Sequence, residues 1–367
     1  MIQTPSPRAR IGQWLLLLAL GAAGWYLVSN AADNLSLRHV PLGFGWLGNT
    51  ANFDIPFRLI EFSPANTYAR ALLVCVLNTL LVSVMGIVTA SLLGLLVGIM
   101  RLSTNWLVRN LALTFIEIVR NTPMLVQIVF WYVAVLQTLP GPRQSIVLGG
   151  GFLLNIRGIY LPVPIFRDGT EWLGWLAAAL VVATPLVWRT RLARWALVLL
   201  AAALAVLAYG IDRIDAPAMR GFNIAGGVQL PPELAAVWAG LSIYSAAFIA
   251  EIVRSTIQAV HRGQREAALS LGLKPGQVMR LVVLPQAARM MMPPLTSQYL
   301  NLIKSSSLGA AVAYPEIFQI FAGTVLNQSG RETETFAIVM GIFLGINLSV
   351  SAVMNLFNRR LARQVAR

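Results

Sequence analysis

Residues 70–100 form an apolar run longer than a helix of an ordinary soluble domain requires. As an α-helix the run would be about 46 Å long, whereas the hydrocarbon core of a bilayer is about 30 Å thick, so this helix would tilt or project from the membrane. Only 11% of the 367 residues are charged and 57% are hydrophobic, although soluble domains carry roughly a quarter charged residues. The sequence therefore predicts an all-α, polytopic integral membrane protein.

The apolar runs of the chain predict about eight transmembrane helices. A further run, residues 305–326, is assigned to a re-entrant or interfacial helix, because the arginine-rich segment after the last span belongs inside. The first run has aromatic residues at both ends, as an anchored span does, and a cleaved signal peptide is the alternative interpretation. The predicted spans are residues 11–30, 70–100, 119–139, 172–188, 196–210, 235–257, 284–303 and 335–357.

Two of these spans carry small residues at every fourth position. Such a stripe lets a second helix approach closely, so it indicates a packing face rather than a ligand site. The first stripe is Gly86, Ala90, Gly94 and Gly98, and the second is Ala337, Gly341, Gly345 and Ser349.

The positive charge of the chain is concentrated on one side of the predicted spans. Eight spans place both termini in the cytosol, and almost all of the net charge of +14 then falls in cytosolic segments, as the positive-inside rule requires. The high isoelectric point is therefore a sign of topology. Membrane lipid is the expected environment, and nucleic acid is not expected as a partner.

A polar, basic segment, residues 262–283, interrupts the apolar runs. Glu266 lies in a short helix that Gly272 can end, because glycine readily adopts the left-handed backbone at a helix C-terminus. Pro275 suits the first position of a second helix, where its missing N–H costs nothing. The exposed face would carry Ala267, Ala268, Leu269 and Leu271 among Arg262, Arg265, Glu266 and Lys274. An apolar knob with a charged rim predicts that this helix seats in the groove of another protein.

The spacing within this segment is specific. Glu266-Ala267-Ala268 is followed by Gly272, Val282 and Leu284-Pro285. This order resembles the cytosolic EAA loop in membrane subunits of ATP-binding-cassette importers, with Val282 in place of the usual isoleucine. The resemblance implies that a separate ATPase contacts Glu266, Ala267, Ala268, Leu269 and Gly272.

Further segments resemble the polar amino-acid permease branch of these importers. They include residues 249–260, 301–309 and the stretch around Asn121, where the family commonly has glycine. The match covers residues 70–139 and 235–357 and implies a five-helix core. The first span and residues 172–210 extend beyond that core and resemble the larger subunits of general L-amino-acid importers.

The resemblance also implies partners and a source of energy. The only lysines, Lys274 and Lys304, do not lie in a Gly-x-x-x-x-Gly-Lys-Ser/Thr phosphate loop. ATP and Mg²⁺ are therefore expected in a dimeric partner ATPase, together with a second permease subunit, identical or paralogous, and a periplasmic amino-acid-binding protein. No cofactor, metal ligand or catalytic residue is expected in this chain, whose two histidines, His39 and His261, lie far apart in the sequence.

Polar residues within the spans are candidates for a substrate path. Glu251 and Arg254 lie near the inner end of a span, where each charge needs a partner or a wet cavity. They could pair with each other one turn apart or reach the interface, or they could line a path for the ammonium and carboxylate groups of an amino acid. Asn121, Thr122 and Gln127 could serve either in the path or in helix capping and interhelical hydrogen bonds.

These observations together predict a permease subunit of the bacterial inner membrane that moves L-amino acids. The alternative is a secondary transporter or channel driven by an ion gradient, which would need ionisable residues near mid-membrane and inverted repeats. A membrane-embedded enzyme would need a cluster of nucleophile, base or metal ligands. The predicted organisation is an N-terminal span with an external loop (1–69), the first part of the core (70–139), inserted loops with a transmembrane hairpin (140–234), the second part of the core with the loop 262–283 (235–357) and a basic tail (358–367).

Overall fold

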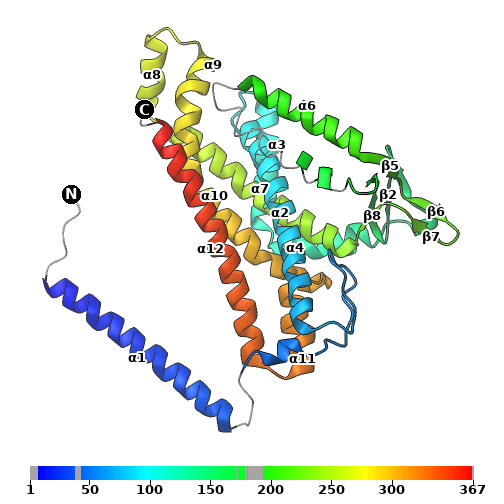
Figure 1. Cartoon of the computed structure of the whole chain (residues 1–367). Helices are drawn as coiled ribbons and strands as arrows, with labels where there is room; N and C mark the ends of the chain where they lie inside the picture. The colour runs from blue at the N-terminus through cyan, green and yellow to red at the C-terminus, as the bar shows by residue number, and fades with distance from the viewer. Residues whose placement is uncertain are drawn as a thin grey trace.

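The computed structural model describes residues 7–37, 43–170, 172–174, 176–177, 180 and 193–365. Helices dominate these residues, as predicted (Figure 1). The first helix, α1 (Pro7–Leu37), covers the predicted first span and stands apart from the others in Figure 1. Its apolar side chains are exposed, among them Trp14 and Trp25. Such a surface suits contact with lipid.

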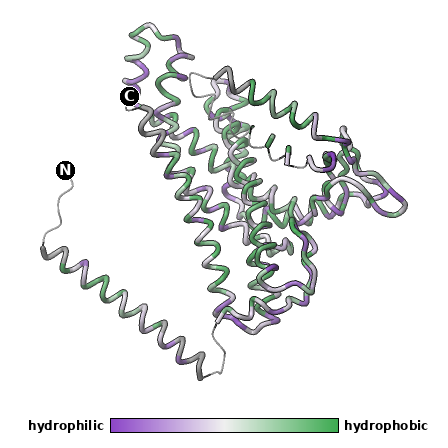
Figure 2. The backbone as a smooth tube through the Cα atoms, in the orientation of Figure 1, coloured by the Kyte–Doolittle hydropathy of each residue, from purple (hydrophilic) through white to green (hydrophobic). Residues whose placement is uncertain are grey.

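Long helices form the bundle beside α1. They are α2 (Tyr68–Arg101), α7 (Pro232–Ala259), α10 (Leu284–Ser305) and α12 (Glu332–Val365). By length and composition, three helices among the described residues could cross a membrane: Tyr68–Arg101, Pro232–Ala259 and Glu332–Asn358. The bent pair Trp106–Asn121 and Met124–Leu136 would make a fourth if it forms one span. Figure 2 shows hydrophobic residues along these helices and hydrophilic residues at the ends of the bundle.

The number of eight spans stays a prediction. The arm 172–188 of the predicted hairpin and its arginine-bearing turn fall largely outside the described residues. The second arm corresponds to α6 (Ala193–Gly210), an apolar helix of 18 residues.

The glycine stripe of α2 lies against α7, which confirms it as a packing face. A Cβ atom on Gly98 would lie 2.9 Å from the carbonyl oxygen of Ala250. Gly86 faces α10 instead, where a Cβ would lie 3.2 Å from Leu302. The stripe of α12 differs, because no atom lies within 4 Å of the corresponding positions on Gly341 and Gly345. The described part of the chain therefore leaves this second stripe unpacked.

The predicted span 119–139 stays a prediction, and the structure shows a sharp bend near its start. The chain forms α3 (Trp106–Asn121), then α4 (Met124–Val129) and a π-helical turn η2 (Phe130–Leu136), and the two parts are bent by 103°. Thr122 between them is extended, with φ −100° and ψ 126°. The cause is Pro123, because a proline disfavours helical backbone in the residue before it.

Residues 140–166 and 211–230, predicted as loops, form strands and are called the β insert here. Its largest sheet has four antiparallel strands in the order β1-β2-β3-β8, and two strand pairs, β4 with β5 and β6 with β7, complete it. The strands are β1 (Ile146–Leu148), β2 (Phe152–Asn155), β3 (Gly158–Leu161), β4 (Val163–Phe166), β5 (Ile211–Asp215), β6 (Ala218–Arg220), β7 (Asn223–Ala225) and β8 (Val228–Leu230). A 3-10 turn, η3 (Pro142–Gln144), precedes them. The β insert leads directly into α7.

Residues 43–67, also predicted as a loop, pack as a cap on one end of the bundle. The cap contains a short 3-10 helix, η1 (Gly45–Gly48), and buries Trp46, Ile55 and Phe62. These side chains belong to one apolar cluster with residues of α2 and of the π-helical segment η6 (Phe318–Val325). The loop is therefore part of the fold.

Residues 305–326 do not form one continuous helix. A 3-10 segment, η5 (Ser306–Val312), is followed by Ala313 in the left-handed region (φ +59°), then by η6 and α11 (Leu326–Ser329). Glu316 at the break is fully buried and accepts hydrogen bonds from the backbone N–H groups of Phe318 (2.8 Å) and Gln319 (2.6 Å). A re-entrant or interfacial role for this broken segment stays a prediction.

Candidate functional site

The polar segment 262–283 projects from one end of the bundle, beside the C-terminal end of α12 (Figure 1). It begins with α8 (Arg262–Ser270), whose N-cap is His261: the Nδ1 atom of this side chain accepts a hydrogen bond from the N–H of Gly263 (3.1 Å). An N-cap acceptor satisfies one of the backbone donors that the first helical turn leaves without a partner. The start of α8 is thereby fixed.

Gly272 ends α8 as the sequence predicts. Its φ is +81°, in the left-handed region. The N–H of Gly272 donates to the carbonyl of Leu269 (2.9 Å), and the N–H of Leu273 donates to the carbonyl of Ala268 (3.3 Å). These two bonds are the Schellman motif, which satisfies the last carbonyl groups of a helix. An L-residue at 272 would strain this turn.

The outer face of α8 and its turn is apolar at its centre. Leu271 is 83% exposed and Leu269 is 48% exposed, while Glu266 and Ala267 are also open to solvent. The predicted exposure of Ala268 is wrong. This residue is 5% exposed and packs in the core of the chain with Val278 and Val283, because it lies on the inner side of the helix.

The second arm of the segment continues into the bundle. In α9 (Pro275–Val278), Pro275 takes the first helical position, as predicted, and the N–H of Lys274 donates to Oε1 of Gln277 (2.9 Å). A π-helical turn, η4 (Met279–Val283), then joins α9 to α10 without an intervening loop. Arg265 differs from its predicted place on the outer rim, because its Nη2 donates to the carbonyl of Ile257 in α7 (3.3 Å). The loop is thus connected to both α7 and α10.

Glu251 and Arg254 pair with each other, one turn apart on α7. Nε of Arg254 donates to Oε2 of Glu251 (3.0 Å), Nη2 pairs with Oε1, and Nη1 reaches Gln258. Both side chains are half-buried. The structure confirms the interpretation as an intrahelical pair, and it also leaves one edge of the pair open.

Asn121, Thr122 and Gln127 gather at the break between α3 and α4. Gln127 is buried, and its Nε2 donates to the carbonyls of Val119 (2.9 Å) and Thr122 (3.1 Å). The hydroxyl of Thr122 donates to the carbonyl of Ile118 (2.9 Å). Thr122 and Gln127 therefore stabilise the bend, whereas Asn121 is exposed beside Glu117.

Arg120 brings the end of α3 close to the charged pair on α7. Its guanidinium carbon lies 5.0 Å from the centre of the Phe248 ring, and Phe248 lies one turn before Glu251 in α7. Sequence reasoning missed Arg120, because the 103° bend that positions it follows from the tertiary fold. Phe248, Glu251 and Arg254 thus form a small polar and aromatic face on α7.

Comparisons with known proteins place this chain in a family. The family model described as "Binding-protein-dependent transport system inner membrane component" matches residues 180–363. The chain is 45% identical to a putative amino-acid ABC transporter permease protein, YhdX, of Escherichia coli, over 98% of this chain and 95% of that protein. The chain belongs to this family of transport permeases.

Two further relatives resemble the permease over nearly its whole length. The general L-amino acid transport system permease protein AapQ of Rhizobium johnstonii is 42% identical, over 98% of this chain and 93% of that protein. The glutamate/glutamine/aspartate/asparagine transport system permease protein BztB of Rhodobacter capsulatus is 38% identical, over 95% and 92%. The similarity therefore includes the β insert as well as the core.

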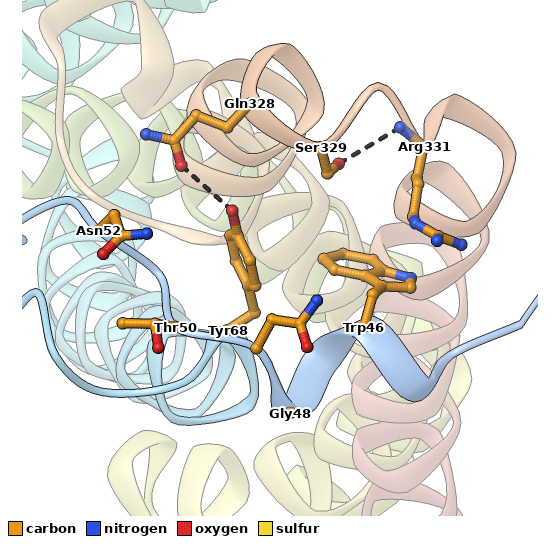
Figure 3. A pocket seen from close by; sticks show the side chains of 9 residues that line it. Trp46, Gly48, Thr50, Asn52, Tyr68, Gln328, Ser329 and Arg331 are labelled. Atoms are coloured by element: carbon orange, nitrogen blue, oxygen red, sulfur yellow. Dashed lines mark hydrogen bonds between the residues drawn. The ribbon is translucent and has the colours of Figure 1, made fainter.

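A polar hollow (Figure 3) lies beside α11, which Figure 1 shows at the end of the permease opposite α8. It has a volume of about 750 Å³ and is formed where the cap 43–67 meets the start of α2 and the junction of α11 and α12. The hydroxyl of Tyr68 pairs with Oε1 of Gln328 across it (3.3 Å). The lining residues are Trp46, Gly48, Asn49, Thr50, Asn52, Tyr68, Gln328, Ser329 and Arg331. Sequence reasoning missed this site, because its residues come from segments that the apolar pattern marks only as connections.

Among the residues that the structure describes, no three His, Cys, Asp or Glu side chains gather closely enough to hold a metal ion. Cys75 is a buried free thiol in α2.

Proposed function

We propose that the permease is the membrane subunit of an ATP-driven importer of L-amino acids in the bacterial inner membrane, with both termini in the cytosol. The relatives named above support the substrate class, because each is a permease of an amino-acid transport system. One structural observation carries the mechanism. The segment 262–283 projects as a short capped helix with an apolar, exposed centre, which is the form of surface that seats in a partner's groove.

In this proposal a dimeric ATPase, which binds ATP and Mg²⁺, receives α8. Glu266, Ala267, Leu269, Leu271 and Gly272 form the contact, and buried Ala268 supports them from below. Movement of α8 passes to α10 through the continuous helix of α9 and η4, and to α7 through Arg265. Rigid connections of this kind support the conversion of ATPase closure into helix movement.

The substrate path in this proposal runs along the polar face of α7. Glu251 and Arg254 offer charges of both signs, and Arg120 approaches from α3, where Asn121 is the next residue. Such groups suit an amino acid, whose carboxylate and ammonium groups need charged or hydrogen-bonding partners once they leave water. A second permease subunit, identical or paralogous, would close the open side of this face. A periplasmic amino-acid-binding protein would deliver the substrate.

The test is uptake by the purified importer in lipid vesicles with a panel of amino acids. We expect uptake that requires ATP on the side of α8 and that disappears in Gly272→Asp and Glu266→Arg, together with co-purification of the ATPase. Thr333→Ala, at the opposite end of the permease, is the control. Uptake driven by an ion gradient without ATP, or retention of the ATPase by both variants, would contradict the proposal.

A further inference from the structure

We propose that the β insert carries a site for a carboxylate side chain of a protein on the external side of the membrane. The site is a hollow of about 450 Å³. It lies between η3, the turn that connects β2 and β3, and the β6–β7 hairpin. Its lining residues are Gly141, Pro142, Arg143, Gln144, Arg157, Phe222 and Asn223. The inference rests on the proposed function for the side of the membrane, and its chemistry comes from the hollow itself.

Two guanidinium groups line this hollow and are held in place. The guanidinium carbon of Arg143 lies 4.5 Å from the centre of the Phe222 ring, a cation–π contact. Nη1 of Arg157 donates to Oδ1 of Asn223 (3.0 Å). Each arginine therefore reaches the β6–β7 hairpin, which is remote in sequence.

The backbone of Arg157 is fixed as well. Its N–H donates to Oδ1 of Asn155 (2.8 Å), and its carbonyl accepts a hydrogen bond from Nε2 of Gln229 in β8 (2.7 Å). Asn155 is fully buried. The arginine is thus presented by a braced turn, which lowers the entropy that a bound partner would have to remove.

The charge of the hollow selects an anion. None of its seven lining residues is acidic. Guanidinium groups match carboxylates in shape and form paired, charge-assisted hydrogen bonds with them. A carboxylate bound here would contact Arg143 and Arg157 together.

The same charge favours a protein side chain over a free amino acid. A free amino acid brings an ammonium group, which would meet two guanidinium groups and no carboxylate in the lining. An Asp or Glu side chain of a protein brings no such cost. Phe222 beside the hollow is 78% exposed, and an exposed aromatic next to arginine is typical of the residues that dominate protein interfaces.

The position of the β insert places this site on the external side. Strand β8 leads into the start of α7, whereas α8 follows the end of α7. The 28 residues of α7 correspond to about 42 Å of helix, enough to cross the hydrocarbon core. If α8 meets a cytosolic ATPase and α7 crosses the membrane, this chain order places the insert on the side from which substrate arrives. The partner we propose is the amino-acid-binding protein of the importer.

The experiment uses the complete importer in vesicles with its binding protein titrated on the outside. In Arg143→Glu/Arg157→Glu we expect the concentration of binding protein that gives half-maximal ATPase stimulation to rise at least about tenfold, because two charge-assisted contacts are lost. The maximal ATPase rate and the co-purification of both membrane subunits should stay unchanged. Arg143→Lys/Arg157→Lys, which keeps both positive charges, should show a smaller rise in this concentration.

Arg213→Glu is the matched control, since Arg213 is an exposed arginine of the same insert outside the hollow. An equal shift in this control, or no shift in the double variant, would overturn the site. Loss of the second permease subunit from the double variant would instead assign the hollow to that subunit and overturn the proposed partner. If the double variant loses binding of a free amino acid, measured without the binding protein, the proposed partner is also overturned. If the wild-type importer shows no ATP-driven uptake, the proposed function fails, and direct binding of the binding protein to the purified variants still decides the site.

Discussion

Gly94 in α2 lies directly against Ile249 in α7: a Cβ atom on Gly94 would be 2.6 Å from the Cβ of Ile249. Two helices approach this closely only where one of them lacks a side chain. Both helices are among those that could cross a membrane. This contact therefore sets how the two central helices of the permease pack.

Gly94→Ala should destabilise the folded permease by about 1–3 kcal/mol, because the added methyl overlaps Ile249 in a closely packed interface. The midpoint of thermal unfolding in detergent measures the effect. Gly341→Ala is the matched control, since no atom lies within 4 Å of the added methyl and alanine favours a helix. Equal midpoints for the two variants would show that α2 and α7 are not closely packed at Gly94.

Leu271→Asp should abolish co-purification of the ATPase while the permease remains folded. The side chain is 83% exposed, so the change removes no internal contact and places a charge at the centre of the predicted contact. Phe44→Asp, an equally drastic change at an exposed site at the other end of the molecule, should leave the ATPase bound. Retention of the ATPase by Leu271→Asp would argue against this face as the docking surface.

His261→Ala should weaken the start of α8 by about 1 kcal/mol, since the N–H of Gly263 loses its acceptor. Hydrogen exchange of the amides in α8 reports this directly. His261→Asn, which restores a side-chain acceptor at the N-cap, should restore protection. Faster exchange in both variants would mean that the imidazole does more than cap the helix.

Gln127→Leu should destabilise the permease by about 1–3 kcal/mol, because the carbonyls of Val119 and Thr122 lose their shared donor at a buried site. Asn121→Ala, at an exposed position of the same bend, should change the unfolding midpoint little. The two midpoints, measured side by side, separate the role of Gln127 at the bend from a general sensitivity of this segment. An unchanged unfolding midpoint in Gln127→Leu would show that the bend depends on Pro123 alone.

Glu251→Gln should lower stability more than the double change Glu251→Gln/Arg254→Gln. The single change leaves a half-buried arginine without its carboxylate partner, and the double change removes both charges. If this pair also lines the substrate path, both variants should lose uptake. Normal uptake by the stable double variant would remove the pair from the path.

Local sequence rules predicted the features that local chemistry decides. The end of α8 at Gly272, the start of α9 at Pro275 and the close approach at Gly94 each follow from the properties of one residue type. The burial of Ala268 did not follow, because it depends on the direction in which α8 faces the rest of the chain. The bend at Thr122 was missed, since its magnitude is set by packing.

The β insert was missed for a different reason. Its strands are three to five residues long and are separated by glycine-rich turns, so the alternation that marks a strand is too short to recognise. Strand β8 pairs with β3 across almost 70 intervening residues, as Tyr160 opposite Gln229 illustrates. Long-range pairing of this kind leaves no local trace. The hollow between Arg143 and Arg157 depends on that pairing and was equally invisible.

Helix α7 has neighbours of very different kinds at its two ends. A single residue separates strand β8 from α7, and two residues separate α7 from α8. Gly94 and Gly98 of α2 contact α7 only between Ala246 and Val253, so this stretch can act as a pivot for a stiff helix. A force that moves the β8 end of α7 to one side would therefore move its α8 end to the other side.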